Sequence, residues 1–323
     1  MTTDHFDSLD EFALLPADAA EFGLPWQGAP AVTRVTVAAD DGPVSLLRWG
    51  APSAADGQPD LVLLHGAALN AHTWDVFALA SRRPLLAVDL PGHGESAWRD
   101  DARYGPEDLA PAIAELIRGQ ASAPVTLVGQ SLGGLTAIAL AAAHPELVAR
   151  LVLVDVLPAV GNPEQVRSFL DGPEVFASRA AIVTRARAFG FGHSEASVAR
   201  GVWHNTRVRP DGSVVWKHHL GNLGGPVTLG GSRPDSGQPP VPADFSALWP
   251  ALEAFGGPVL LVRGERGFLP AGAGAELRSR VPGAQVRDVA AGHNVQEDDP
   301  VGLAAIVAEF LTETGARAAG AVQ

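Results

Sequence analysis

Cysteine is absent from the 323 residues of this sequence. Its absence excludes disulfide bonds, a thiolate nucleophile and a cysteine-ligated metal in one step. Residues 1–28 show neither the basic segment nor the apolar segment of a signal peptide. Because a chain without cysteine also fits a reducing compartment, we expect a cytoplasmic protein.

Basic residues are scarce as well, since 23 Lys and Arg face 36 Asp and Glu and give a net charge of -13. Lys217 is the only lysine, and no basic cluster offsets the negative charge locally. Such a chain repels the phosphates of nucleic acids and of anionic lipids. We therefore expect a small-molecule substrate and neither a nucleic acid nor a membrane as partner, while a homodimer remains open.

A candidate for a membrane span is "LVGQSLGGLTAIALAAAHP", residues 127–145, which is mostly apolar and contains a G-x-x-x-G pattern. Gln130 and Ser131 interrupt it, and its flanks resemble a strand and a helix instead of one apolar helix. With 46% hydrophobic and 18% charged residues, the chain has the composition of an ordinary globular protein. Its length predicts one large domain or a domain with an insertion.

Strand-like and helix-like segments alternate through most of the chain. An N-terminal hairpin is predicted from "AVTRVTVAA" and "PVSLLRWG", joined at Asp41 and Gly42. Helical segments such as "PEDLAPAIAELIRG" lie between continuous apolar runs, the pattern of strands buried on both faces of a parallel sheet. These runs are "DLVLLHG", "PLLAVDLPG", "PVTLVGQ", "LVLVDV", "PVLLVRGE" and "AQVRDVAAGH". The pattern predicts an α/β fold with a doubly wound, mostly parallel sheet.

The alternation stops between residues 158 and 247, where two segments have helical patterns and "RVRPDGSVVWKHHL" resembles a short hairpin. A structureless loop of this length is improbable, so we predict an inserted helical subdomain that returns to the sheet through a Gly/Pro-rich stretch at 220–242. The expected organisation is an N-terminal extension (1–28), a core (29–157 and 248–323) and a cap insertion (158–247).

Gly129–Gly133 forms a G-x-S-x-G motif directly after a predicted strand and at the start of a predicted helix. Small residues on both sides leave room for a strained turn that exposes the hydroxyl of Ser131. The helix that begins there directs unpaired N–H groups toward a developing oxyanion. A Gly-rich chain can contain this motif as a plain turn, but its position favours Ser131 as a nucleophile.

Two histidines follow predicted strands. His65 precedes Gly66 and Ala67 at the end of a buried strand, and we expect it to shape that turn without transferring protons. His293 follows the last strand and precedes a helix whose start is marked by Asp299 and Pro300. A histidine in this position, far C-terminal to the serine, is the candidate general base.

Five segments together resemble the α/β-hydrolase family with an inserted cap: "LLHGAALNAHTWD", "AVDLPGHGES", "LVGQSLGG", "LVLVDVLP" and "AAGHNVQEDDP". The resemblance implies a sheet of the eight-stranded α/β-hydrolase type. It implies that Ser131 is the nucleophile and His293 the base. It also implies an oxyanion hole formed by the backbone N–H groups of Ala67 and Leu132. His93 belongs to a loop that is structural in this family, and the resemblance implies neither a cofactor nor a metal.

The acid of the expected triad is harder to assign. The family usually places it after the strand that precedes the last one, and there this chain has Gly267. Asp155, at the end of "LVLVDV", lies one strand beyond the nucleophile, where some relatives carry the acid. Glu265 is the alternative, and Asp288, inside a strand, is a weaker one. We predict that Asp155 accepts the second ring N–H of His293.

A serine at the nucleophile position excludes relatives that use an aspartate there. It predicts hydrolysis of an ester, lactone or similar acyl bond of a small to medium hydrophobic substrate through an acyl-enzyme. Hydrolysis of a C–C bond, a non-catalytic ligand-binding protein and a cofactor-free lyase or oxygenase remain alternatives on this fold. Cap residues Trp203, His204, Asn205 and Trp216 are candidate substrate contacts, although each could simply pack within the cap.

Overall fold

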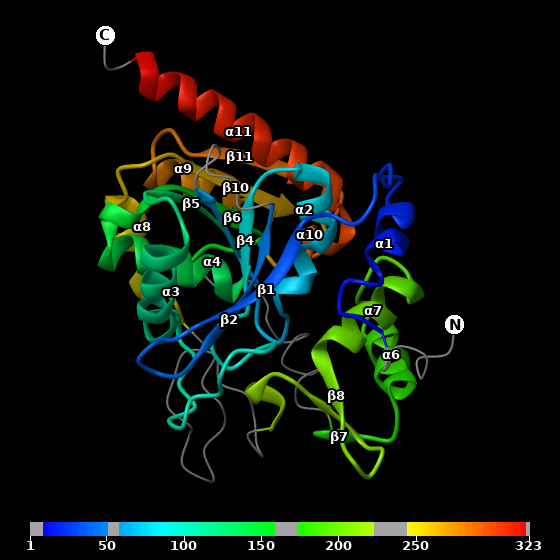
Figure 1. The fold of residues 1–323 in the computed structure, drawn as a ribbon. Helices are drawn as coiled ribbons and strands as arrows, with labels where there is room; N and C mark the ends of the chain where they lie inside the picture. The colour runs from blue at the N-terminus through cyan, green and yellow to red at the C-terminus, as the bar shows by residue number, and fades with distance from the viewer. Residues whose placement is uncertain (1–8, 51–57, 159–172, 223–243, 321–323) are drawn as a thin grey trace.

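The structure, a computed structural model, describes residues 9–50, 58–158, 173–222 and 244–320. Its centre is an eight-stranded sheet with the strand order β1-β2-β4-β3-β5-β6-β10-β11 (Figure 1). The first three strands in this order pair antiparallel, and the others pair parallel. The strands are β1 (Val32–Val37), β2 (Val44–Trp49), β3 (Leu61–Leu64), β4 (Leu85–Val88), β5 (Val125–Gln130), β6 (Val148–Val154), β10 (Val259–Gly264) and β11 (Gln285–Val289).

Helices cover both faces of this sheet. One face carries α3 (Pro106–Gln120), α4 (Leu132–Ala143), α8 (Trp249–Ala254) and α9 (Ala273–Arg280). The other face carries α1 (Leu15–Glu21), α2 (Asp75–Ser81), α10 (Val295–Asp298) and α11 (Pro300–Gly320). Each layer has its own apolar cluster against the sheet, which is why the central strands are apolar on both faces. No helix within the described ranges is long and apolar enough to cross a bilayer.

The last strand departs from the expectation. The sequence predicts that "AQVRDVAAGH" forms a strand buried on both faces, but β11 lies at the edge of the sheet and its residues are partly or fully exposed. Asp288 on this strand pairs with Arg263 at 2.8 Å. Edge strands tolerate charges because one side has no neighbouring strand to cover it.

Between β6 and α8 the described residues 173–222, which we call the cap, form a separate small unit. It contains α6 (Arg179–Ala188), α7 (Glu195–Asn205) and a three-stranded sheet in the order β7-β9-β8. These strands are β7 (Val175–Phe176), β8 (Thr206–Val208) and β9 (Val214–Trp216). The cap has its own apolar cluster, and the expected hairpin is part of this sheet. Most of the Gly/Pro-rich return at 220–242 lies outside the described residues.

Candidate active site

Ser131 occupies a sharp turn between β5 and α4. Its backbone has φ 51° and ψ -120°, a conformation that costs a non-glycine residue about 1–3 kcal/mol. A Cβ atom on Gly129 would collide with the backbone of Gly133, and one on Gly133 would collide with the backbone at the end of β3. The flanking glycines are therefore needed because strand and helix approach each other too closely for any side chain.

His293 and Asp155 are brought together by two loops. His293 lies between β11 and α10, and its Nδ1 is 2.8 Å from Oδ2 of Asp155, which follows β6 and is 1% exposed. The carboxylate also accepts the N–H groups of Gly264 at 3.1 Å and Phe268 at 2.8 Å. Since a carboxylate only accepts, Nδ1 of His293 carries the proton and Nε2 keeps a free lone pair.

Gly267 explains how Asp155 reaches this position. A Cβ atom on Gly267 would collide with both carboxylate oxygens of Asp155. The missing side chain at the usual site of the acid therefore leaves room for an acid supplied by the neighbouring strand. Glu265, the alternative acid, is exposed at the end of β10. Asp288 is held by Arg263 on the edge strand.

The two expected oxyanion donors lie at either side of the serine. Ala67 is in the turn after β3 and lines the same cavity as Ser131, while Leu132 is the first residue of α4. Within the described part of the chain, neither backbone N–H donates a hydrogen bond. Both donors are thus available, and the dipole of α4 favours negative charge at its N-terminus.

His65 and His93 hold loops in place. His65 accepts the N–H of Leu90 at 3.0 Å through Nε2 and donates through Nδ1 to the carbonyl of Gly66 at 2.7 Å. Burial lowers the pKa of His65 to about 4, so the ring is neutral at pH 7. His93 donates through Nδ1 to the carbonyl of Pro91 at 3.1 Å. Neither histidine lines the cavity that contains Ser131.

A cavity of about 230 Å³, which we call the Ser131 cavity, lies between the core and the cap. Ser131 and His293 line it from the core. Its apolar lining includes Phe22 beside α1 and, from the cap, Ala186, Phe191, Val198, Val202 and Trp216. The site therefore combines a nucleophile and a base with a mostly apolar binding space.

Three of the four expected cap contacts line the Ser131 cavity: His204, Asn205 and Trp216. Asn205 also accepts a hydrogen bond from Asn70 of the core at 2.6 Å. Trp203 does not line this cavity; it lines a second one of about 460 Å³, which we call the Trp203 cavity. Trp203 and His204 differ in this way because neighbouring residues on a helix point about 100° apart, and the role of Trp203 in substrate binding stays a prediction.

Sequence reasoning missed the polar groups between core and cap. Arg200 of α7 forms ion pairs with Asp18 and Glu21 of α1. Asp18 is 7% exposed, and burial raises its pKa to about 7 although Arg200 acts in the opposite direction. No local sequence signal links residues 18 and 200, because the contact depends on how the cap docks.

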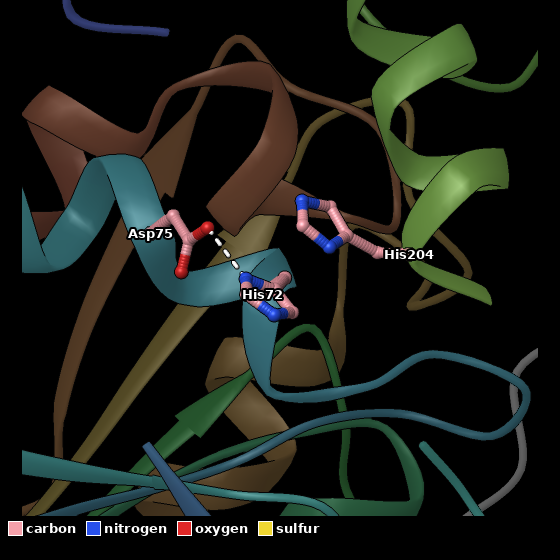
Figure 2. A group of neighbouring side chains, drawn as sticks. All are labelled: His72, Asp75 and His204. Atoms are coloured by element: carbon pink, nitrogen blue, oxygen red, sulfur yellow. Dashed lines mark hydrogen bonds and ion pairs between the residues drawn. The ribbon is translucent and has the colours of Figure 1, made fainter. Parts of the chain in front are cut away.

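A second missed group consists of His72, Asp75 and His204, which also line the Ser131 cavity (Figure 2). His72 donates through Nδ1 to Asp75 at 2.8 Å, and its ring stacks on that of His204. Burial and neighbouring positive groups lower the pKa of His204 well below its usual value. The spacing of His72 and Asp75 within "NAHTWD" was a usable signal, since residues three apart share one face of a helical turn.

Comparison with known proteins agrees with this fold. The alpha/beta hydrolase family matches residues 61–306. Esterase Rv0045c of Mycobacterium tuberculosis is 36% identical over 96% of this chain and 99% of its own length. A solved structure of that esterase, described together with its inhibition by transition metals, has a TM-score of 0.76 and covers 94% of this chain and 99% of its own.

A more distant relative is the mouse sn-1-specific diacylglycerol lipase ABHD11, 27% identical over 78% of this chain and 81% of its own length. The thioesterase domain from the curacin biosynthetic pathway, 21% identical with a TM-score of 0.68, covers 86% of this chain and 99% of its own and shares the fold. The expected fold is confirmed by these matches and by the sheet order. The chain belongs to the alpha/beta hydrolase family.

Proposed function

We propose that this protein is a serine esterase that cleaves its substrate through an acyl-enzyme on Ser131. The observation that carries the proposal is the 2.8 Å contact between the buried carboxylate of Asp155 and His293, which lines the same cavity as the strained Ser131. The similarity of this chain to a mycobacterial esterase over nearly its whole length supports the same reaction class.

The chemistry follows from the positions of these groups. Nε2 of His293 takes the hydroxyl proton of Ser131 as Oγ attacks the ester carbonyl. The backbone N–H groups of Ala67 and Leu132 stabilise the oxyanion. His293 then protonates the leaving alcohol, and a water molecule activated by the same ring hydrolyses the acyl-enzyme. Asp155 orients the ring and stabilises the imidazolium without taking the proton.

The substrate class follows from the walls of the Ser131 cavity. The volume of about 230 Å³ and the apolar side chains of the cap suit a small to medium hydrophobic acyl or alcohol group. We propose such a small molecule as the substrate and the cytoplasm as the location, the latter on the composition of the chain.

The test is a series of p-nitrophenyl esters of increasing acyl length, assayed with the wild type and Ser131→Ala. We expect a maximum of kcat/KM at short or medium chains and no turnover above background in the variant. Equal turnover in both proteins would contradict the assignment.

Trp216→Ala and Trp203→Ala form a matched pair for the substrate pocket, because both are cap tryptophans and only Trp216 lines the Ser131 cavity. We expect Trp216→Ala to move the preferred chain length and Trp203→Ala to leave it unchanged. A shift of the same size in both variants would contradict the assignment of Trp216 to the substrate pocket.

A further inference from the structure

Three side chains with metal-ligating chemistry meet where the cap touches the core. His72 lies in the short 3-10 helix η2 (Ala71–Trp74), Asp75 begins α2, and His204 lies in the last turn of α7 (Figure 2). Each offers one ligand atom, and these three atoms all lie within 4.8 Å of one another. We call this group the histidine cluster.

The cluster is tightly packed, and not all of its polar atoms have hydrogen-bond partners. The rings of His72 and His204 stack with centroids 3.6 Å apart and an interplanar angle of 16°. Asp75 is 4% exposed, and its Oδ1 has no hydrogen-bond partner among the described residues. A buried carboxylate with an unpaired oxygen is costly, so a bound cation would lower the free energy of this arrangement.

We propose that His72, Asp75 and His204 bind a divalent transition-metal ion of the Zn²⁺ type and that this ion clamps the cap to the core. Two imidazole nitrogens and one carboxylate oxygen suit Zn²⁺, Co²⁺, Ni²⁺ or Cu²⁺, whereas Mg²⁺ and Ca²⁺ prefer oxygen ligands alone. Three protein ligands leave a fourth position for water. The ion has no part in the ester chemistry assigned to Ser131.

Binding requires a rotation of one side chain and a shift of one proton. A tetrahedral Zn²⁺ holds its ligand atoms roughly 3.3–3.5 Å apart, so the ring of His204 must rotate toward the pair formed by His72 and Asp75. In this structure Nη2 of Arg34 lies 3.1 Å from Nε2 of His72. Because a guanidinium only donates, Nδ1 of His72 then carries the ring proton.

The ion takes the place of the Nδ1 proton, and that proton moves to Nε2. The contact between Arg34 and Nε2 is lost in this step. Arg34 stays anchored, because Glu11 binds its Nε and Asp89 binds its Nη1. The net charge of the protein side chains is unchanged by the exchange.

The position of the cluster determines how an ion reaches it and how a bound ion acts on the cap. His72 and His204 line the Trp203 cavity as well as the Ser131 cavity, so an ion can reach them without passing the nucleophile. Two ligands belong to the core and one to the cap. A bound ion therefore ties the two together beside Ser131 and hinders exchange of substrate and product.

The binding test uses the full chain and needs no ester turnover. Co²⁺ titration should give the visible absorption of a tetrahedral site, and equilibrium dialysis should give one Zn²⁺ per chain. His204→Gln and Asp75→Asn should weaken binding by more than the ~10- to 100-fold that loss of a supporting residue costs. His144→Gln, a histidine outside both cavities, is the matched control. Absence of binding to the wild type, or equal binding by folded His204→Gln, overturns the site.

The clamp is tested separately, and its effect on turnover rests on the proposed function. Zn²⁺ should slow p-nitrophenyl ester hydrolysis reversibly with EDTA, and the inhibition constant should rise in His204→Gln in parallel with the dissociation constant. Zn²⁺ should also slow tryptic cleavage of the cap, a measurement that stands without any esterase activity. Binding without protection of the cap, or equal inhibition of the wild type and His204→Gln, overturns the clamp.

Discussion

The two walls of the Ser131 cavity are held by different interactions. On the core wall, backbone N–H groups fix the carboxylate of Asp155, and glycine contacts fix the turn that carries Ser131. On the cap wall, side chains make the links: Asn205 binds Asn70, and Arg200 binds α1. Backbone-fixed groups move only with the sheet, whereas side-chain links can break singly. The catalytic groups are thus held rigidly, whereas the side-chain links between cap and core, which control access to them, can change one at a time.

The largest expected effect lies on the core wall. Ser131→Ala should lower kcat about 10⁶-fold, because the nucleophile of a triad accounts for a loss of that order. Its thermal melting temperature should not fall, since alanine suits the turn and no hydrogen bond of the hydroxyl stabilises the described structure. Hydrolysis of p-nitrophenyl acetate with baseline subtraction measures the effect. Turnover well above background would remove Ser131 from the mechanism.

Asp155→Asn should lower kcat by roughly 10⁴, because asparagine stabilises the wrong tautomer of His293 and cannot stabilise the imidazolium. Glu265→Gln is the matched control, since Glu265 is the exposed acid nearest to the usual family position. We expect near-normal kcat in that control. A large loss in Glu265→Gln with a small loss in Asp155→Asn would reverse the assignment.

Gly267→Ala should lower kcat/KM by about 10²-fold, because its methyl group would displace the carboxylate of Asp155 and misplace His293. Gly256→Ala is a suitable control, since a Cβ atom there meets nothing within 4 Å. Steady-state kinetics of both variants measure the difference. Equal activity would show that the carboxylate has more room than the structure allows.

These core-wall features were largely predictable. The strand before Ser131, the helix after it and the loop with His293 follow from short-range patterns, because buried parallel strands are apolar throughout. The position of Asp155, at the end of the strand that follows the nucleophile, also led to its prediction as the acid. The cap wall was not predictable, since Asp18 and Arg200 are 182 positions apart and meet only after the cap has docked. Which residues of α7 face the Ser131 cavity was not predictable either, because the sequence does not fix the rotation of that helix.

The last expected effect lies on the cap wall and concerns stability instead of turnover. Burial raises the pKa of Asp18 from 3.8 to about 7, so the folded protein binds an extra proton between these pH values and loses stability as pH rises. Asp18→Asn lacks this titration. Its free energy of unfolding relative to wild type should therefore increase from pH 4 to pH 7, by up to about 1.4 kcal/mol per pH unit.

Urea denaturation at pH 4.5, 5.5 and 6.5 measures this difference between the two proteins. Glu107→Gln, an exposed carboxylate on α3, is a control that should show no such trend. A difference that stays constant or decreases with pH would mean that Arg200 outweighs burial at Asp18.

The central claim is that Ser131 is an activated nucleophile in the cavity between core and cap, and one measurement tests it most directly. The folded wild-type protein is incubated with a fluorophosphonate, and the modified residue is located by peptide mass spectrometry. We predict one phosphonate per chain, on Oγ of Ser131, formed with loss of fluoride and much more slowly in Asp155→Asn. Folded protein that stays unmodified, or is modified at another residue, would contradict the account.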